Sequence, residues 1–309
     1  MILSICFDPI LETKYYVDKL LPREESLANK KTYNISGKGL ITGRILNNFN
    51  VDVFATGFLG GLQGEYISNR LKEIAIYNEF IPIKDDSKSS VIIIKDDNLL
   101  TSIVEESPRV TREEQGFFYE LYSKIIDRFY IICSQGNLPI GLPDDIYFDL
   151  ISIANKNNKK FILQAKGEEL KRGLEAIPFM VILDKEDLEY LSNLRLDFEN
   201  EIIKVGHSII EKGIKLVCID LNEKGSIVLT KDKGYRLEID NSIVNLQKDK
   251  GYMVAGFAFG LYKNYDMETI LRLAQASRLV YAMEDELDRI DMSDIKRFMT
   301  KIDIYPINY

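Results

Sequence analysis

Short apolar runs alternate with amphipathic segments along most of this 309-residue chain, and this alternation constrains the fold more than any other feature. Apolar runs lie at 51–60, 129–134, 159–165, 179–184 and 215–220, and a further run, ILSICF, stands at the beginning. Runs of this length and composition are typical of parallel strands buried on both faces.

The segments between these runs have the spacing of apolar residues that is typical of helices. They lie at 43–49, 65–76, 113–126, 144–156, 201–213 and 267–283. Strand alternating with helix predicts a mostly parallel sheet that is covered by helices on both faces. The length fits one large α/β domain, and we expect residues 1–309 to form it.

Two segments interrupt this rhythm, because both show strand patterns without a helix between them. They are residues 11–36 and 87–106, and the second is expected to be a hairpin that turns at residues 95–98. Strands inserted at two places in an α/β chain predict a small β-lid over the main sheet.

The composition excludes several classes of function. The single His, His207, cannot supply a His-rich metal site, and three scattered Cys without a CxxC spacing cannot form a zinc ribbon. A net charge of −8 without a basic block argues against nucleic-acid binding. No apolar stretch is long enough to span a membrane, and the first ten residues lack the basic start of a signal peptide. We therefore expect a cytoplasmic protein with reduced cysteines.

Seven motifs follow one another along the chain in a recognisable order. They are DPILETKYYVD (8–18), SGKGLITGRILNNFN (36–50), ATGFLGGLQGEYI (55–67), TSIVEESP (101–108), SQGNLPIGLP (134–143), PFMVILDKEDLEYL (178–191) and MVAGFAFGL (253–261). Together they resemble the phosphofructokinase-B group of the ribokinase superfamily, especially 1-phosphofructokinases and tagatose-6-phosphate kinases. The resemblance implies a ribokinase-like three-layer α/β/α sandwich with a β-clasp lid. It also implies transfer of a phosphoryl group from ATP, with Mg²⁺, to a hydroxyl of a phosphorylated ketose.

The resemblance implies a sugar-phosphate site on one side of the cleft. Its residues would be Asp8, Glu12, Gly37, Lys38, Gly39, Lys88, Gly136 and Asn137. Lys38 would contact the substrate phosphate, and its flanking glycines would let the anion approach the backbone closely. One departure lies at Ile41, which replaces an Asn of the family and cannot hydrogen-bond a sugar hydroxyl.

The nucleotide side departs further from the pattern of the family. The resemblance places Asp220, Asn222 and Gly225 along the ATP phosphates, where the carboxylate of Asp220 would repel a triphosphate. Asp184 and Asp187 stand at the motif linked to magnesium. Their spacing allows weak magnesium binding or, alternatively, an acidic helix N-terminus.

The catalytic Gly-Ala-Gly-Asp element of the family corresponds here to residues 248–251. Lys248 and Lys250 replace its glycines, and Gly251 stands at the position of the catalytic Asp. Gly251 cannot accept a proton, and Asp249 stands two residues too early to replace the missing base without a large displacement. The two lysines could still attract phosphate, although a solvated loop is the simpler interpretation.

Two hypotheses of function follow. The first is an ATP-dependent ketose-phosphate kinase of the fructose-1-phosphate or tagatose-6-phosphate type, with low or absent turnover. The second is a non-catalytic sugar-phosphate sensor or a regulatory partner of an active paralogue. A different chemistry in the same cleft is a third and weaker interpretation. Because the lid commonly pairs between subunits in this group, we also expect a homodimer through the lid.

Overall fold

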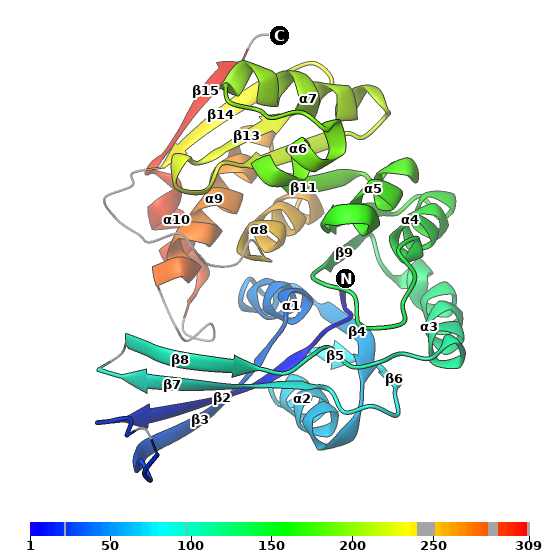
Figure 1. Ribbon diagram of the computed structural model, residues 1–309. Helices are drawn as coiled ribbons and strands as arrows, with labels where there is room; N and C mark the ends of the chain where they lie inside the picture. Colours follow the sequence, from blue (N-terminus) through cyan, green and yellow to red (C-terminus); the bar gives the residue numbers. More distant parts are fainter. Residues whose placement is uncertain (22, 97, 240–250, 284–289, 308–309) are drawn as a thin grey trace.

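A large mixed sheet forms the centre of the computed structural model (Figure 1), which describes residues 1–309 except 22, 97, 240–250, 284–289 and 308–309. Its parallel part runs in the order β12 (Leu216–Asp220), β11 (Met180–Asp184), β10 (Lys160–Gln164), β9 (Ile131–Gln135), β1 (Ile2–Cys6), β4 (Val53–Leu59) and β5 (Tyr77–Asn78). The short strand β6 (Ile81–Pro82) also pairs with β4. Each apolar run that the sequence pattern marks as a parallel strand lies in this part of the sheet.

An antiparallel extension continues the sheet beyond β12. It consists of β13 (Ser226–Leu229), β14 (Gly234–Ile239) and β15 (Ile302–Ile307). The sequence pattern does not predict these strands. β13 and β14 follow β12 through short turns without an α-helix, as antiparallel neighbours can, whereas β15 pairs with β14 from the far end of the chain, after residues 251–299. Their presence makes the sheet mostly, but not wholly, parallel.

Helices cover both faces of the sheet and give the three layers of a ribokinase-like fold. One face carries α1 (Lys38–Asn48), α2 (Gly61–Glu73), α8 (Gly251–Tyr262), α9 (Met267–Met283) and α10 (Met292–Met299). The other carries α3 (Arg112–Ile125), α4 (Ile146–Lys156), α5 (Gly167–Glu175), α6 (Lys185–Ser192) and α7 (Glu199–Glu211). Short 3-10 turns lie at Ile126–Arg128 and Asn222–Lys224. Each helical layer buries its own apolar core against the sheet.

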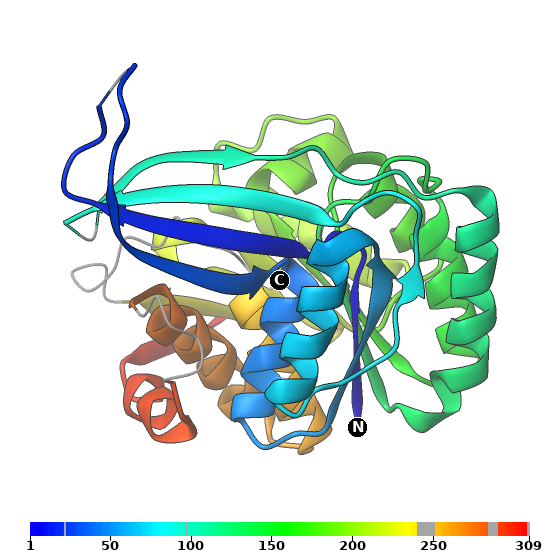
Figure 2. The ribbon, with the colours of Figure 1, turned by 90° about the horizontal axis from the view of Figure 1, so that it is seen from below.

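A second, smaller sheet has the strand order β3 (Ala28–Ser36), β2 (Ile10–Val17), β7 (Lys88–Lys95) and β8 (Asn98–Val104). Its strands come from the two segments that interrupt the strand–helix rhythm, and we call this sheet the lid. Figures 1 and 2 show the lid extending beyond the body of the molecule. The edge strand β8 carries exposed apolar side chains, with Leu99 65% and Ile103 64% exposed.

The residues with distinctive chemistry are mostly structural. Cys6, Cys133 and Cys218 form no disulfide and are buried at β1, β9 and β12, as expected for strand residues. His207 lies on α7, where its Nδ1 atom is 3.5 Å from a carboxylate oxygen of Glu211 on the same helix. In the part of the chain that the structure describes, no helix has the length and apolar character that crossing a membrane requires.

Helix α1 lies so close to β1 that Gly39 allows no side chain. A Cβ atom at Gly39 would lie 2.4 Å from the carbonyl oxygen of Ile5 and 2.7 Å from Cβ of Cys6. Ser4 strengthens the same contact, because its hydroxyl donates to the Gly39 carbonyl at 2.7 Å. This packing fixes the position of the first turn of α1.

We predict that Gly39→Ala lowers the free energy of unfolding by about 1–3 kcal/mol, because the new methyl group must displace backbone atoms. Gly116→Ala is the matched control: Gly116 is also helical, but no atom would lie within 4 Å of its new Cβ. The control should raise the free energy of unfolding by about 0.5–1 kcal/mol through helix propensity. Chemical denaturation measures both, and equal effects would contradict the packing argument.

Candidate functional site

A cavity of about 150 Å³ opens where the lid meets the carboxyl ends of β1 and β9. Its lining comprises Cys6, Asp8, Ile10, Ser36, Gly37, Lys38, Lys88, Gln135, Gly136 and Asn137. The carboxyl edge of parallel strands is where open α/β sheets ordinarily bind ligands. The volume is below the roughly 300–1,000 Å³ that drug-sized ligands occupy, so this cavity suits a small ligand.

Two larger hollows lie elsewhere, about 510 Å³ between α4 and α5 and about 400 Å³ beside α2. The first is lined mainly by carboxylates, including Asp144, Asp145 and Glu168, and it would repel an anion. The second lies along an open groove with two glutamates, Glu65 and Glu79, in its lining. We regard the smaller cavity as the functional site because cationic and polar groups from separate elements converge there.

Six of the eight residues implied for the sugar-phosphate site line this cavity. Among them, Lys88 of the lid forms an ion pair with Asp8, with 3.1 Å between Nζ and Oδ2. Ser107 donates its hydroxyl to the same carboxylate oxygen at 3.0 Å. These contacts connect the start of β7 in the lid, and Ser107, to the loop that follows β1.

Lys38 provides a second cation at the first residue of α1. It is half-buried, and it has no hydrogen-bond or ion-pair partner within the described residues. Helix α1 begins after Gly37 without a side-chain cap, and Gly37 adopts a φ of 110° that favours glycine. A helix N-terminus and an unpaired ammonium group at one wall of a cavity favour an anionic ligand.

Buried oxygen acceptors without partners lie beside these cations. Asp8 Oδ1, Gln135 Oε1 and Gln164 Oε1 each lack a hydrogen-bond partner in the described part of the chain. Gln135 lines the cavity itself, and Gln164 lines a small pocket that adjoins it at Lys38. Buried acceptors of this kind require donors. Hydroxyl groups of a ligand are suitable donors, so the wall fits a polyol that carries an anionic group.

Glu12 and Gly39 belong to the predicted sugar site but do not line the cavity. Glu12 accepts a hydrogen bond from Asn34 Nδ2 at 2.9 Å, and the amide oxygen of Asn34 accepts in turn from the buried Arg44 at 2.8 Å. Gly39 serves the packing of α1 against β1. Ile41, at the position of the Asn of the family, is buried in the apolar core.

The cavity also holds a thiol, Cys6, at the end of β1. Burial is the main cause that raises its pKa to about 12, and the negative charge of Asp8 acts in the same direction. Backbone N–H groups of Leu40 and Gly39 oppose this shift without overcoming it. The thiol therefore stays protonated at neutral pH and is not a nucleophile.

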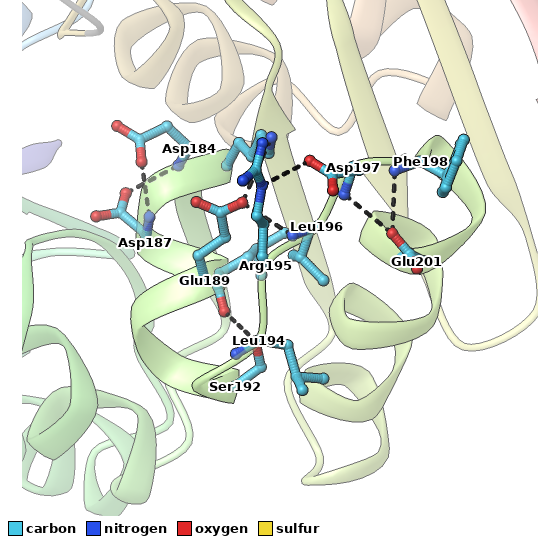
Figure 3. Close-up of polar contacts among 12 residues, drawn as sticks. Asp184, Asp187, Glu189, Ser192, Leu194, Arg195, Leu196, Asp197, Phe198 and Glu201 are labelled. Carbon is cyan, nitrogen blue, oxygen red and sulfur yellow. Dashed lines mark hydrogen bonds and ion pairs between the residues drawn. The ribbon is translucent and has the colours of Figure 1, made fainter.

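Asp184 and Asp187, the predicted magnesium residues, bond to each other's backbone at the start of α6 (Figure 3). Asp184 Oδ1 accepts from the N–H of Asp187 at 2.8 Å, and Asp187 Oδ2 accepts from the N–H of Asp184 at 2.8 Å. Lys166 lies 3.2 Å from the other oxygen of Asp184. Burial tends to lower the pKa of Lys166, but its neighbouring carboxylates outweigh burial and raise it. This is the arrangement of an acidic helix cap.

These contacts leave little for a metal ion. Oδ1 of Asp184 and Oδ2 of Asp187 already accept backbone N–H groups. Oδ2 of Asp184 faces the ammonium group of Lys166. Across the described residues, no three or more His, Cys, Asp or Glu side chains gather as metal ligands would. Asp184 and Asp187 therefore serve the cap of α6, and the described residues form no site with three or more protein ligands for a metal ion.

Asp220, on the predicted nucleotide side, is completely buried at the end of β12. Its Oδ1 atom is 2.7 Å from Nη1 of Arg278 on α9, and the same oxygen accepts the N–H of Asn222 at 2.9 Å. Gly225 adopts a φ of 90°, and a Cβ atom there would lie 2.0 Å from the carbonyl oxygen of Leu237. Gly225 is thus required where the turn approaches β14, and these residues do not form an open phosphate cradle.

Gly251 is the first residue of α8, and its carbonyl oxygen accepts the hydroxyl of Thr42 at 2.9 Å. Thr42 in turn accepts a hydrogen bond from the amide of Gln135. The start of α8 is therefore connected to the cavity wall through two buried side chains. Lys248, Asp249 and Lys250 lie outside the described residues.

Several residues of the site escape a reading of the sequence alone. Gln135 and Gln164 end apolar strands, and a polar residue at that point is a usable signal for a ligand edge. Ser107 and Thr42 carry no such signal, because their partners lie far away along the chain. Arg278 stands in an ordinary amphipathic helix pattern, so nothing local marks its contact with Asp220.

Comparison with known proteins agrees with the resemblance. Residues 1–279 match the family model described as pfkB family carbohydrate kinase. A structure assigned as a phosphofructokinase from Staphylococcus aureus aligns with 100% of this chain and 99% of its own, at 22% identity and a TM-score of 0.87. One assigned as a 1-phosphofructokinase from Thermotoga maritima aligns over 99% of both chains, at 20% identity and a TM-score of 0.87.

The tetrameric inhibited form of phosphofructokinase-2 from Escherichia coli is also similar. It aligns with 97% of this chain and 98% of its own, at 18% identity and a TM-score of 0.82. At these identities the structural likenesses show the fold, and the family match covers most of the sequence. The chain therefore belongs to the pfkB family of carbohydrate kinases.

Proposed function

We propose that this protein binds a phosphorylated sugar in the cavity between the lid and β1, and that it transfers phosphoryl groups from ATP very slowly or not at all. The observation that carries the proposal is Gly251 at the start of α8, where the family has its catalytic Asp. Binding and catalysis depend on different residues here, so each is argued separately.

The case for sugar-phosphate binding depends on the chemistry of the cavity wall. Lys38 is an unpaired cation within the described residues, and Lys88 adds a second that Asp8 partly neutralises. The unpartnered acceptors Asp8 Oδ1 and Gln135 Oε1 complement hydroxyl groups. A phosphate group with an attached polyol satisfies both kinds of group at once.

The case against rapid phosphoryl transfer depends on the missing base. The attacking hydroxyl must lose its proton, and a positioned base ordinarily contributes about 10²–10⁴-fold to the rate. Gly251 has no side chain to take that proton, and its carbonyl already accepts from Thr42. Loss of preorganised donors at the migrating charge would reduce the rate by about another 10²–10³-fold.

A protein that binds a sugar phosphate without consuming it suits a sensor or a regulatory partner of an active paralogue. We favour the sensor, because the cavity residues have kept cations and acceptors while the catalytic position has lost its function. We place the protein in the cytoplasm, where its three cysteines, none of them in a disulfide, would remain reduced.

We expect ADP release in the presence of ATP, Mg²⁺ and fructose 1-phosphate, fructose 6-phosphate or tagatose 6-phosphate to be at least about 100-fold below the roughly 1–100 s⁻¹ of ordinary kinases. A coupled assay measures this rate, with an active pfkB-family kinase as the positive control. Turnover in the ordinary range with any of the three sugars would contradict the loss of catalysis.

Sugar-phosphate binding is predicted to depend on Lys38. Lys38→Met should weaken binding by about tenfold or more, because a charge-assisted hydrogen bond to the phosphate is lost. Lys204→Met is the matched control, since Lys204 is exposed on α7, away from the cavity. Titration calorimetry with the same three sugar phosphates measures both affinities. Equal affinities of the two variants would place the phosphate elsewhere.

We also propose that the protein forms a homodimer through the lid. The edge strand β8 leaves backbone groups without a neighbouring strand and exposes Leu99, Leu100, Ile103 and Val104, which are 44–65% exposed. The neighbouring strand β7 is only half-buried along its apolar run. An apolar edge strand of this kind is normally covered, and a second copy of the lid offers matching backbone groups and apolar surface.

The homodimer predicts a specific effect of charge on the lid. Ile103→Lys should convert the dimer to monomers, because a lysine would be buried without a partner in the interface. Leu62→Lys is the control, because Leu62 is a similarly exposed apolar residue (81% exposed) on α2 of the body. Light scattering over a range of protein concentrations gives the masses. A monomeric mass for the unmodified protein would refute the proposal.

A further inference from the structure

A buried ion pair occupies the carboxyl end of β12. Asp220 is the last residue of that strand, and Arg278 reaches it from α9, a helix on one face of the sheet. The side chains are 0% and 2% exposed, and 2.7 Å separates Oδ1 of Asp220 from Nη1 of Arg278. Neither charge is accessible to a dissolved anion, although this edge of the sheet is where ligands ordinarily bind.

The turn that follows, residues 221–225, uses its own backbone donors. Asp220 accepts the N–H of Asn222 at 2.9 Å, and the carbonyl oxygen of Gly225 accepts the N–H of Leu221 at 2.9 Å. The N–H groups of Lys224 and Gly225 donate to carbonyl oxygens within the same turn, at 3.2 and 3.1 Å. Backbone sites for phosphate need N–H groups that point freely at the anion. Only Glu223 in this turn has an N–H without a described acceptor, and its own side chain is acidic.

Neighbouring strands and helices hold this arrangement in place. Gln275, one turn before Arg278 on α9, donates to the buried hydroxyl of Ser226 at the start of β13. On the same helix, Tyr281 stacks on Tyr252 of α8 with 5.6 Å between ring centroids. Arg278 therefore cannot leave Asp220 without moving a helix that is packed on both α8 and the sheet.

We infer that Asp220 and Arg278 form an internal clamp in place of a cradle for nucleotide phosphates, so that the protein binds its ligand without a nucleotide. In the clamp, the carboxylate of Asp220 neutralises the positive charge of Arg278, which would otherwise be available to a bound anion. The turn 221–225 is closed by its own hydrogen bonds and by the approach of Gly225 to β14. The inference deepens the proposed function, since it describes a sugar-phosphate site that works alone.

The first test is titration calorimetry of the full-length protein with ATP, ADP and Mg·ATP, each with and without fructose 6-phosphate. The expected result is no saturable binding of a nucleotide up to about 1 mM, the upper end of ordinary KM values. Saturable nucleotide binding with a dissociation constant below about 1 mM would overturn the inference. Failure of the sugar phosphate to bind would refute only the proposed function, because the nucleotide titrations are read independently.

The second test examines the clamp itself by thermal unfolding. Asp220→Asn leaves the arginine buried without a counter-charge, and the melting temperature should fall by roughly 5–10 °C. The double variant Asp220→Asn with Arg278→Met removes both charges at similar volume and should melt within about 3 °C of the unmodified protein. A single variant that fails to fold beside a stable double variant would support the clamp. An unchanged melting temperature for Asp220→Asn would overturn it.

Discussion

The candidate site depends on how closely helix α1 lies against strand β1. A Cβ atom at Gly39 would lie 2.4 Å from the carbonyl oxygen of Ile5, so the two elements meet backbone to backbone. That contact brings Lys38 and the start of α1 to the end of β1, where the next residues include Asp8. The lid is held over the same point by the ion pair between Lys88 and Asp8. One close packing contact thus positions a cation, a helix N-terminus and the anchor of the lid.

The two sides of the cleft differ in how their polar groups are satisfied. At the cavity, Lys38 and several buried oxygens lack partners within the described residues. At the end of β12, Oδ1 of Asp220 pairs with Nη1 of Arg278, while Oδ2 of Asp220 and Nε of Arg278 have no hydrogen-bond partner within the described residues. The turn after β12 satisfies most of its own backbone. The cavity thus presents a cation without a partner among the described residues, whereas the two charges at the end of β12 are paired and buried.

Membership of the pfkB family does not by itself fix the chemistry, since a fold supports its function only through particular residues. The layers, the lid and the order of the motifs are retained here. The departures concentrate at Gly251, at Asp220 and at the two carboxylates that cap α6. Each of these residues has a structural role in this protein: Gly251 accepts from Thr42, Asp220 pairs with Arg278, and Asp184 and Asp187 cap a helix.

The sequence by itself determined the α/β class, the parallel strands and the two segments of the lid, because burial periodicity is a local property of the chain. It also determined the family and six residues that line the cavity, because the motifs keep their order. Only the tertiary structure decided that Glu12 accepts a hydrogen bond from Asn34. It alone also decided that Asp220 pairs with Arg278, 58 residues further along the chain. The antiparallel strands β13–β15 were likewise decided only by the tertiary structure. Partners that are distant in sequence leave no local pattern, since packing of whole elements brings them together.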